Sequence, residues 1–327
     1  MKYAILVFAI LLIAFVACRQ VPAGGQALRF SKTIIPLRDS SGIYVGDGDS
    51  DRLFYYTLAP KGAVKGALVL FPPNGQTAEE TISANSALAT QAQHKGLLTV
   101  VLSVNHNLYL DEATLRALNK LLADLLAHYP VPTTSVVLGG FSLGGMNAIR
   151  YTELAYQDST ATVIRPAAVY GIDPPLDFAR FYHSCTKAVA KNFSQPAVAE
   201  ATYFLERMNR EFAGSPEAQP ATYVQHSMFS AMSADGGNAR YLRSVPLRIY
   251  CDPDIDWQLA NRRVDYYDMN ALDGAAMINS LHIAGNERAQ FVNALGKGYR
   301  PDGMRHPHSW SLAAPEDCVE WVLRCLR

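Results

Sequence analysis

The feature of this sequence that most constrains its fold is a series of short apolar runs separated by helical segments. Residues 67–71, 97–104 and 135–139 are almost wholly apolar, and the intervening segment 110–128 carries leucines at helical spacing. A strand without polar alternation is buried on both faces, as parallel strands connected by helices are. The sequence therefore predicts an α/β fold, with a mostly parallel central sheet and helices on both faces.

The N-terminal segment has the pattern of an export signal. Lys2 precedes fifteen uncharged residues, 3–17, and a span of a bilayer needs about 20 apolar residues. Cys18 follows a small residue, Ala17, and this junction resembles a bacterial lipoprotein signal, in which the cysteine is lipidated and becomes the new N-terminus. The resemblance implies an exported protein, periplasmic or at the cell surface, anchored in the membrane by lipid at Cys18. The alternative is an ordinary secretory signal with an incidental cysteine.

The composition narrows the class of protein. Lys and Arg total 29, as do Asp and Glu, so no basic surplus exists to neutralise phosphates, and we expect no nucleic-acid partner. Hydrophobic residues make up 49% and charged residues 18% of the chain, which is typical of a globular protein. Five segments follow from the pattern: a signal peptide (1–17), a tether (18–26), a first core part (27–172), a helical insertion (173–244) and a second core part (245–327).

One motif carries recognisable chemistry. Residues 140–144 read Gly-Phe-Ser-Leu-Gly, directly after an apolar strand and before a helical segment. In this strand–turn–helix context, G-x-S-x-G is typical of a nucleophile elbow: the serine takes a strained backbone conformation on a sharp turn, and glycines avoid clashes beside it. The following helix directs its unpaired N–H groups at a developing oxyanion. We therefore predict that Ser142 is a nucleophile.

The motif and the order of elements resemble the α/β-hydrolase superfamily over residues 27–327. The resemblance implies a triad in the order serine, acid, histidine, with the acid after a later strand and the histidine in a loop after the last strand. Residues 245–251 read as that later strand, and Asp252, Asp254 and Asp256 follow it. We expect Asp254 to be the acid, because relatives carry theirs three residues past the strand, with Asp256 as the alternate and as a helix cap.

The base is expected between the final strand and the closing helix. His306 and His308 both lie there, and His308 resembles the superfamily's histidine because Trp310 follows shortly before a helix. We therefore predict His308 as the base and keep His306 as the alternate.

The oxyanion hole needs two N–H donors. One is the backbone N–H of Leu143, directly after the nucleophile. In many relatives the turn after the strand at 67–71 reads His-Gly, whereas here it reads Pro-Pro-Asn-Gly. Pro72 and Pro73 have no N–H group, so the second donor is either Asn74 or Gly75.

These residues predict a serine hydrolase, most closely a bacterial exported carboxylic ester hydrolase, that acts on a small-molecule ester through an acyl-enzyme. Its insertion is expected to be a lid over the active site. No cofactor is expected, and no metal, because neither acidic cluster (47–51 and 252–256) places Gly and Glu as a calcium loop requires. The alternatives are a serine exopeptidase or amidase on the same fold, or a non-catalytic surface-anchored binding protein.

Overall fold

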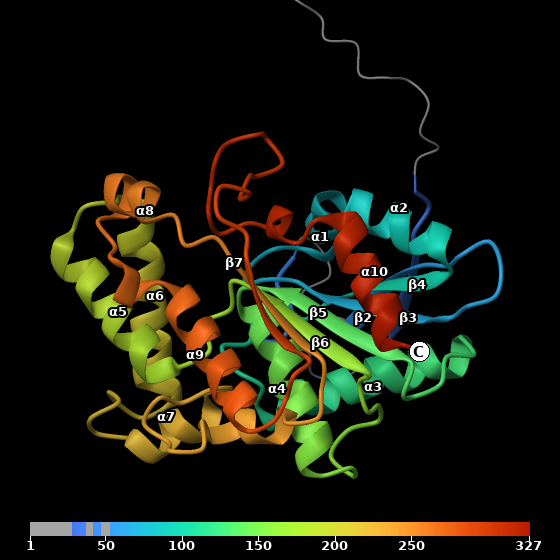
Figure 1. Ribbon diagram of the computed structural model, residues 1–327, viewed down its shortest axis with the longest axis horizontal. Helices are drawn as coiled ribbons and strands as arrows, with labels where there is room; N and C mark the ends of the chain where they lie inside the picture. Colours follow the sequence, from blue (N-terminus) through green and yellow to red (C-terminus); the bar gives the residue numbers. More distant parts are fainter. Residues whose placement is uncertain (1–27, 37–41, 47–52) are drawn as a thin grey trace, which may run out of the picture.

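A computed structural model describes residues 28–36, 42–46 and 53–327. The signal peptide, the tether with Cys18 and the first acidic cluster, which were predicted from the sequence, lie outside the described residues. Figure 1 shows one twisted sheet with helices packed around it.

Eight strands form a single sheet in the order β1-β2-β4-β3-β5-β6-β7-β8. The pairs β1–β2 and β2–β4 are antiparallel, and all other neighbouring pairs are parallel. The strands are β1 (Ser31–Ile35), β2 (Leu53–Leu58), β3 (Gly66–Phe71), β4 (Leu97–Leu102), β5 (Val136–Phe141), β6 (Ala168–Ile172), β7 (Leu247–Cys251) and β8 (Ala289–Asn293). The five strands from β3 to β7 are buried on both faces, which explains their uninterrupted apolar sequences.

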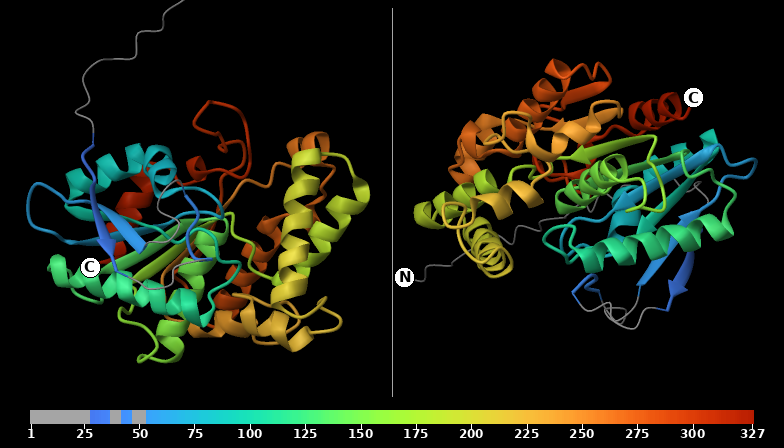
Figure 2. Two further views of the ribbon diagram at one scale, coloured as in Figure 1. Left: turned by 180° about the vertical axis from the view of Figure 1, so that it is seen from behind. Right: turned by 90° about the horizontal axis from the view of Figure 1, so that it is seen from below.

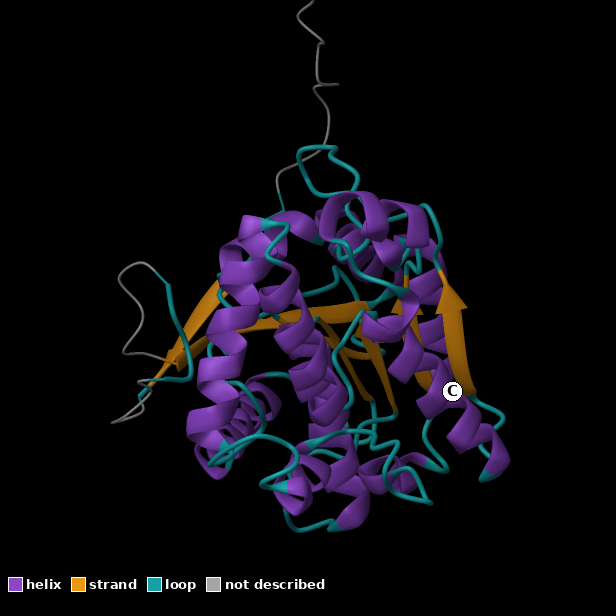
Figure 3. Cartoon of the chain, turned by 90° about the vertical axis from the view of Figure 1, so that its left-hand side faces the viewer, coloured by secondary structure: helices purple, strands orange, loops and turns teal. Residues whose placement is uncertain are grey.

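Helices cover both faces of the sheet, as Figure 3 shows from the side. The helices are α1 (Ala78–Ala84), α2 (Ser86–Lys95), α3 (Glu112–His128), α4 (Leu143–Gln157), α5 (Phe178–Lys191), α6 (Gln195–Glu211), α7 (Pro220–His226), α8 (Ile255–Arg262), α9 (Asn270–Ile283) and α10 (Pro315–Cys325), with short 3-10 helices η1 (Gly237–Leu242), η2 (Tyr266–Asp268) and η3 (Trp310–Leu312). One core cluster joins α1, α2 and α10 to the sheet, and the other joins α3, α4 and α9 to the opposite face. The expected architecture is confirmed.

A helical insertion follows β6 and ends before β7. It contains α5, α6, α7 and η1, and Figure 2 shows α5 and α6, in yellow-green, standing beside the sheet rather than on either face. Phe212 packs edge to face against both Phe178 and Tyr223, and all three side chains are almost wholly buried. These aromatic side chains belong to the same core cluster as one face of the sheet and join the insertion to it, while others line a pocket.

Candidate active site

Ser142 lies on the sharp turn between β5 and α4, at the carboxyl edge of the sheet. Its backbone has φ 55° and ψ −128°, a conformation rare for any residue with a side chain, and persistent strain of this kind is typical of functional positions. The flanking glycines are required by close approach. A Cβ on Gly140 would lie 2.4 Å from the carbonyl carbon of Gly144, and one on Gly144 would lie 2.2 Å from the carbonyl oxygen of Phe71. The turn therefore accepts only glycine at these two positions.

His308 is held by a carboxylate. Its Nδ1 lies 2.6 Å from Oδ2 of Asp173, and both side chains are mostly buried. The imidazole also packs against the ring of Phe141, the residue before Ser142, with ring centroids 4.3 Å apart. With Nδ1 engaged by the carboxylate, Nε2 is the ring nitrogen left to exchange a proton.

The carboxylate that contacts His308 corrects our expectation of Asp254. Asp254 is the N-cap of α8: its Oδ1 accepts from the Trp257 N–H at 2.9 Å, and its Oδ2 accepts from Arg305 at 2.7 Å. Asp254 thus takes the capping role that we predicted for Asp256, which lies in the first turn of α8. The physical reason is that α8 begins at Ile255, immediately after Asp254, and its free N–H groups bind the nearest carboxylate.

Asp252 has a different structural task. It directly follows β7, and its carboxylate accepts from the backbone N–H groups of Gly296 and Gly298 and pairs with Arg305 at 2.7 Å. These contacts fix the start of the segment between β8 and His308. The side chain of Asp252 is wholly buried, so these three partners compensate the loss of water.

Asp173 is the carboxylate at this site that the sequence reasoning missed. It directly follows β6, next to the serine strand in the sheet, and we had assigned it to the first position of the insertion. Its φ of 45° lies in the left-handed region, which Asp tolerates better than most residues, and Asn270 donates to its carbonyl oxygen. The available signal was a carboxylate at the carboxyl end of a buried parallel strand, where ligand sites form.

His306, the alternate base, has a structural environment. Burial, together with the nearby Arg300 and Arg262 guanidinium groups, lowers its pKa to about 4, so the ring is neutral at pH 7. Its Nε2 lies 3.3 Å from the guanidinium of Arg262, which can only donate, so Nδ1 carries the proton and donates to the His308 carbonyl oxygen at 2.9 Å. His306 therefore supports the backbone that carries His308.

The backbone N–H groups of Asn74 and Gly75, the two candidates for the second oxyanion donor, differ in whether they already have an acceptor. The Gly75 N–H donates to the Asn105 carbonyl oxygen at 2.8 Å and is thereby occupied. In the described part of the chain the Asn74 N–H has no acceptor, and Asn74 lines an open groove together with Ser142. Leu143 is the first residue of α4, where helix N–H groups lack intrahelical partners. Leu143 and Asn74 are therefore the pair of N–H groups free to bind an oxyanion.

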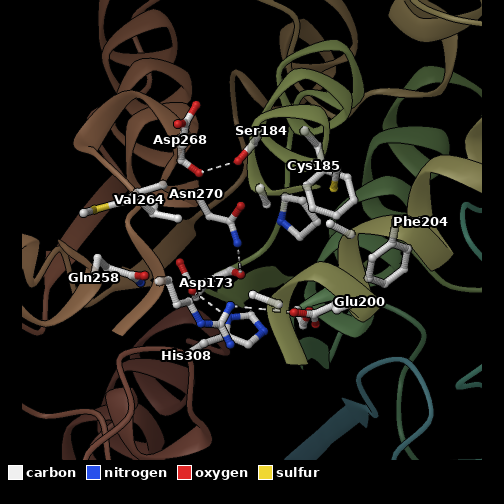
Figure 4. A pocket seen from close by; sticks show the side chains of 18 of the residues that line it. Asp173, Ser184, Cys185, Glu200, Phe204, Gln258, Val264, Asp268, Asn270 and His308 are labelled. Atoms are coloured by element: carbon white, nitrogen blue, oxygen red, sulfur yellow. Dashed lines mark hydrogen bonds and ion pairs between the residues drawn. The ribbon is translucent and has the colours of Figure 1, made fainter. Parts of the chain in front are cut away.

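Two hollows meet at Ser142 and His308. The more enclosed pocket, drawn in Figure 4, has a volume of about 130 Å³ and runs between the insertion and α8. Its walls combine apolar and polar side chains, with Phe181 and Phe204 from the insertion, and Glu200 also lines it. The other hollow is a more open groove along the oxyanion turn. The pair of hollows has room for the two halves of a cleavable molecule.

Comparison with known proteins supports the fold. No protein-family model and no curated protein matches the sequence. Among solved structures, the chain is similar to carboxyl esterase 2 from the mycorrhizal fungus Tuber melanosporum, with a TM-score of 0.58, 14% identity, and 91% of this chain and 88% of that chain covered. It is also similar to the thermophilic carboxylesterase EstE1 from a metagenomic library, with a TM-score of 0.54, 14% identity, and 91% and 90% covered.

A hormone-sensitive lipase from a metagenome library is a third similar structure, with a TM-score of 0.52, 12% identity, and 93% of this chain and 86% of that chain covered. The chain has the α/β-hydrolase fold. At these identities the likeness shows the fold alone.

The described residues also bear on cysteines, metals and membranes. Cys185, Cys251, Cys318 and Cys325 are all free thiols, and the first three are buried. Across residues 28–36, 42–46 and 53–327, no group of three or more His, Cys, Asp or Glu residues is arranged to hold a metal ion. No helix in the same ranges is long and apolar enough to cross a bilayer.

Proposed function

We propose that this chain is a serine hydrolase that cleaves carboxylic esters, with Ser142 as nucleophile, His308 as base and Asp173 as the acid. The observation that supports it most is the combination at one pocket of a strained serine and an imidazole whose Nδ1 lies 2.6 Å from a carboxylate. Nucleophile, base and orienting group in this arrangement are the parts of a catalytic triad.

The proposed reaction has two halves. His308 Nε2 takes the proton of the Ser142 hydroxyl as Oγ attacks the ester carbonyl, and the Asp173 carboxylate stabilises the resulting imidazolium. The N–H groups of Leu143 and Asn74 bind the oxyanion. The intermediate collapses, the imidazolium gives its proton to the leaving alcohol, and an acyl-enzyme remains on Ser142. Water, deprotonated by His308, then releases the acid and restores the hydroxyl.

An ester is proposed in preference to an amide because two of the similar solved structures are named carboxylesterases, and a third is named a hormone-sensitive lipase. The helical insertion is proposed to act as the lid of this site, since α5 and α6 supply part of the pocket wall. A serine exopeptidase or amidase would share the triad, and a binding protein would retain the pocket without turnover.

The test uses a fluorophosphonate probe, which reacts covalently with an activated serine. We expect labelling of the full-length protein, mapped by peptide analysis to Ser142 and abolished in Ser142→Ala. Turnover is then compared between p-nitrophenyl esters and aminoacyl-anilides, and we expect the esters to be cleaved. Labelling that survives at another serine contradicts the nucleophile, faster cleavage of the anilides identifies an amidase, and no reaction with any of the three reagents identifies a binding protein.

A further inference from the structure

Helix α8 directs two polar side chains into the enclosed pocket. Gln258 and Arg262 lie four residues apart, one turn along the same face of α8, and both line the pocket that contains Ser142 and His308. Figure 4 shows Gln258 beside the Asp173–His308 pair. Neither side chain has a role in the reaction described above, so their presence in the wall of this pocket requires another explanation.

The positive charge of Arg262 is poorly compensated. Its nearest carboxylate is Glu200, at 3.7 Å, and the Glu200 side chain is 53% exposed whereas that of Arg262 is 26% exposed. A loose pair with a hydrated partner contributes little. The other neighbour, at 3.3 Å, is His306, which is neutral because its pKa is lowered to about 4. Arg262 therefore presents a guanidinium, with five N–H donors, for which the described residues supply no buried anion.

The other charges around the pocket are better balanced. Arg305 contacts two carboxylates, those of Asp252 and Asp254, at 2.7 Å each. Asp268 lies 2.8 Å from Lys187 and 3.6 Å from Lys191. Among the described residues that line the pocket, Arg262 is the basic side chain left to pair with a ligand.

Gln258 adds a second, independent observation. The oxygen of its amide is buried and has no hydrogen-bond partner in the part of the chain that the structure describes, although a buried polar atom normally has one. The oxygen and nitrogen of an amide are interchangeable by rotation, so this side chain can present N–H groups at the same place. An amide and a guanidinium one helical turn apart form a set of donors suited to a carboxylate.

We propose that the enclosed pocket binds the acyl part of the ester substrate, and that this acyl part ends in a carboxylate. The substrate is then a half-ester of a dicarboxylic acid. This inference rests on the proposed ester hydrolysis. The acyl part is assigned here because it stays attached to Ser142 through the acyl-enzyme stage, whereas the alcohol must leave, and the more open groove lets it leave. Arg262 pairs with the carboxylate in place of Glu200, and the apolar side chains of the walls contact the methylene groups.

The experiment compares monoethyl with diethyl esters of succinic, glutaric and adipic acid, by following ethanol release. We expect the wild-type protein to prefer at least one monoethyl ester by about tenfold or more in kcat/KM. In Arg262→Gln this preference should fall by about 10- to 100-fold, the loss typical of a hydrogen bond between charged groups. The ratio of kcat/KM for the monoethyl ester to that for the diethyl ester cancels effects common to both, including any disturbance of the neighbouring His306.

Two further variants separate recognition from general disturbance. Arg263→Gln is the matched control, because Arg263 follows Arg262 but lies over the Phe193 ring and lines neither hollow, and it should keep the wild-type preference. Glu200→Gln removes the competing carboxylate and should raise the preference. An unchanged preference in Arg262→Gln, or an equal loss in Arg263→Gln, overturns the proposal.

Failure of the proposed function would give a different result. If wild type cleaves p-nitrophenyl esters but neither the monoethyl nor the diethyl esters, the inference is overturned while the hydrolase proposal stands. If it cleaves none of these esters, the hydrolase proposal fails, and calorimetry still tests the pocket. Ser142→Ala should bind monoethyl glutarate or adipate more tightly than the diethyl ester, and adding Arg262→Gln should remove the difference. Equal binding of both esters overturns the inference.

Discussion

Replacement of Asp173 by Asn is the perturbation that most directly tests the site. Asn keeps the size of the side chain but removes the charge 2.6 Å from His308 Nδ1. Two unit charges about 4 Å apart at an effective dielectric constant of about 20 interact by about 4 kcal/mol, which suits a pair that is 16% and 26% exposed. At about 1.36 kcal/mol for each factor of ten, this alone predicts a loss of about 10³ in kcat.

The amide adds a second effect. The Nδ2 group of Asn would face the Nδ1–H of His308, and the ring then favours the tautomer in which Nε2 carries the proton and cannot accept one from Ser142. Loss of the acid in a triad costs about 10⁴ in kcat when both effects act. We therefore expect a loss of about 10³ to 10⁴ in kcat for a p-nitrophenyl ester at pH 7.5, with little change in Tm.

Asp254→Asn is the matched control, since it makes the same chemical change. Asn caps a helix about as well as Asp, and Arg305 keeps its contact with Asp252. We expect kcat within tenfold of wild type and a loss of stability of about 1 kcal/mol or less. If Asp254→Asn lost about 10³ or more in kcat while Asp173→Asn stayed within tenfold of wild type, the assignment of the acid from this structure would be refuted.

Three further changes have definite expected results. Gly144→Ala should lower the free energy of unfolding by about 1–3 kcal/mol in chemical denaturation, because its Cβ would lie 2.2 Å from the Phe71 carbonyl oxygen, whereas Gly62→Ala, with nothing within 4 Å, should leave stability nearly unchanged. His306 has a folded-state pKa of about 4, below the roughly 6.5 of an unfolded histidine, so its contribution to stability is present above pH 6.5 and is lost as the pH falls towards 4. The wild-type protein should therefore lose about 1–2 kcal/mol more stability than His306→Gln between pH 7 and 4.5, and equal losses would contradict this. Cys18→Ser should release the protein from the membrane fraction of a bacterial host if the lipoprotein-like junction is processed as proposed, and a variant that remains membrane-bound would contradict the anchor.

The sequence by itself determined the class of fold and the place of the strained serine. A strand with an uninterrupted apolar sequence has no polar face to expose to water. The chain therefore buries such strands in a parallel sheet covered by helices on both sides. Gly140 and Gly144 flank Ser142 at fixed local spacing, and a strained turn between a strand and a helix is a local property of about five residues. Such features can be read without knowing how distant segments meet.

Only the tertiary structure decided which carboxylate faces His308. Asp173 and His308 are 135 residues apart, and they meet because β6 and the segment after β8 end at the same edge of the sheet. Asp252 and Asp173 both directly follow a parallel strand, so local sequence does not separate them. The difference arises from what lies opposite each one. The carboxylate of Asp252 accepts hydrogen bonds from the backbone N–H groups of Gly296 and Gly298, whereas the His308 imidazole lies opposite Asp173. Such pairing depends on distances between segments, and sequence spacing does not specify those distances.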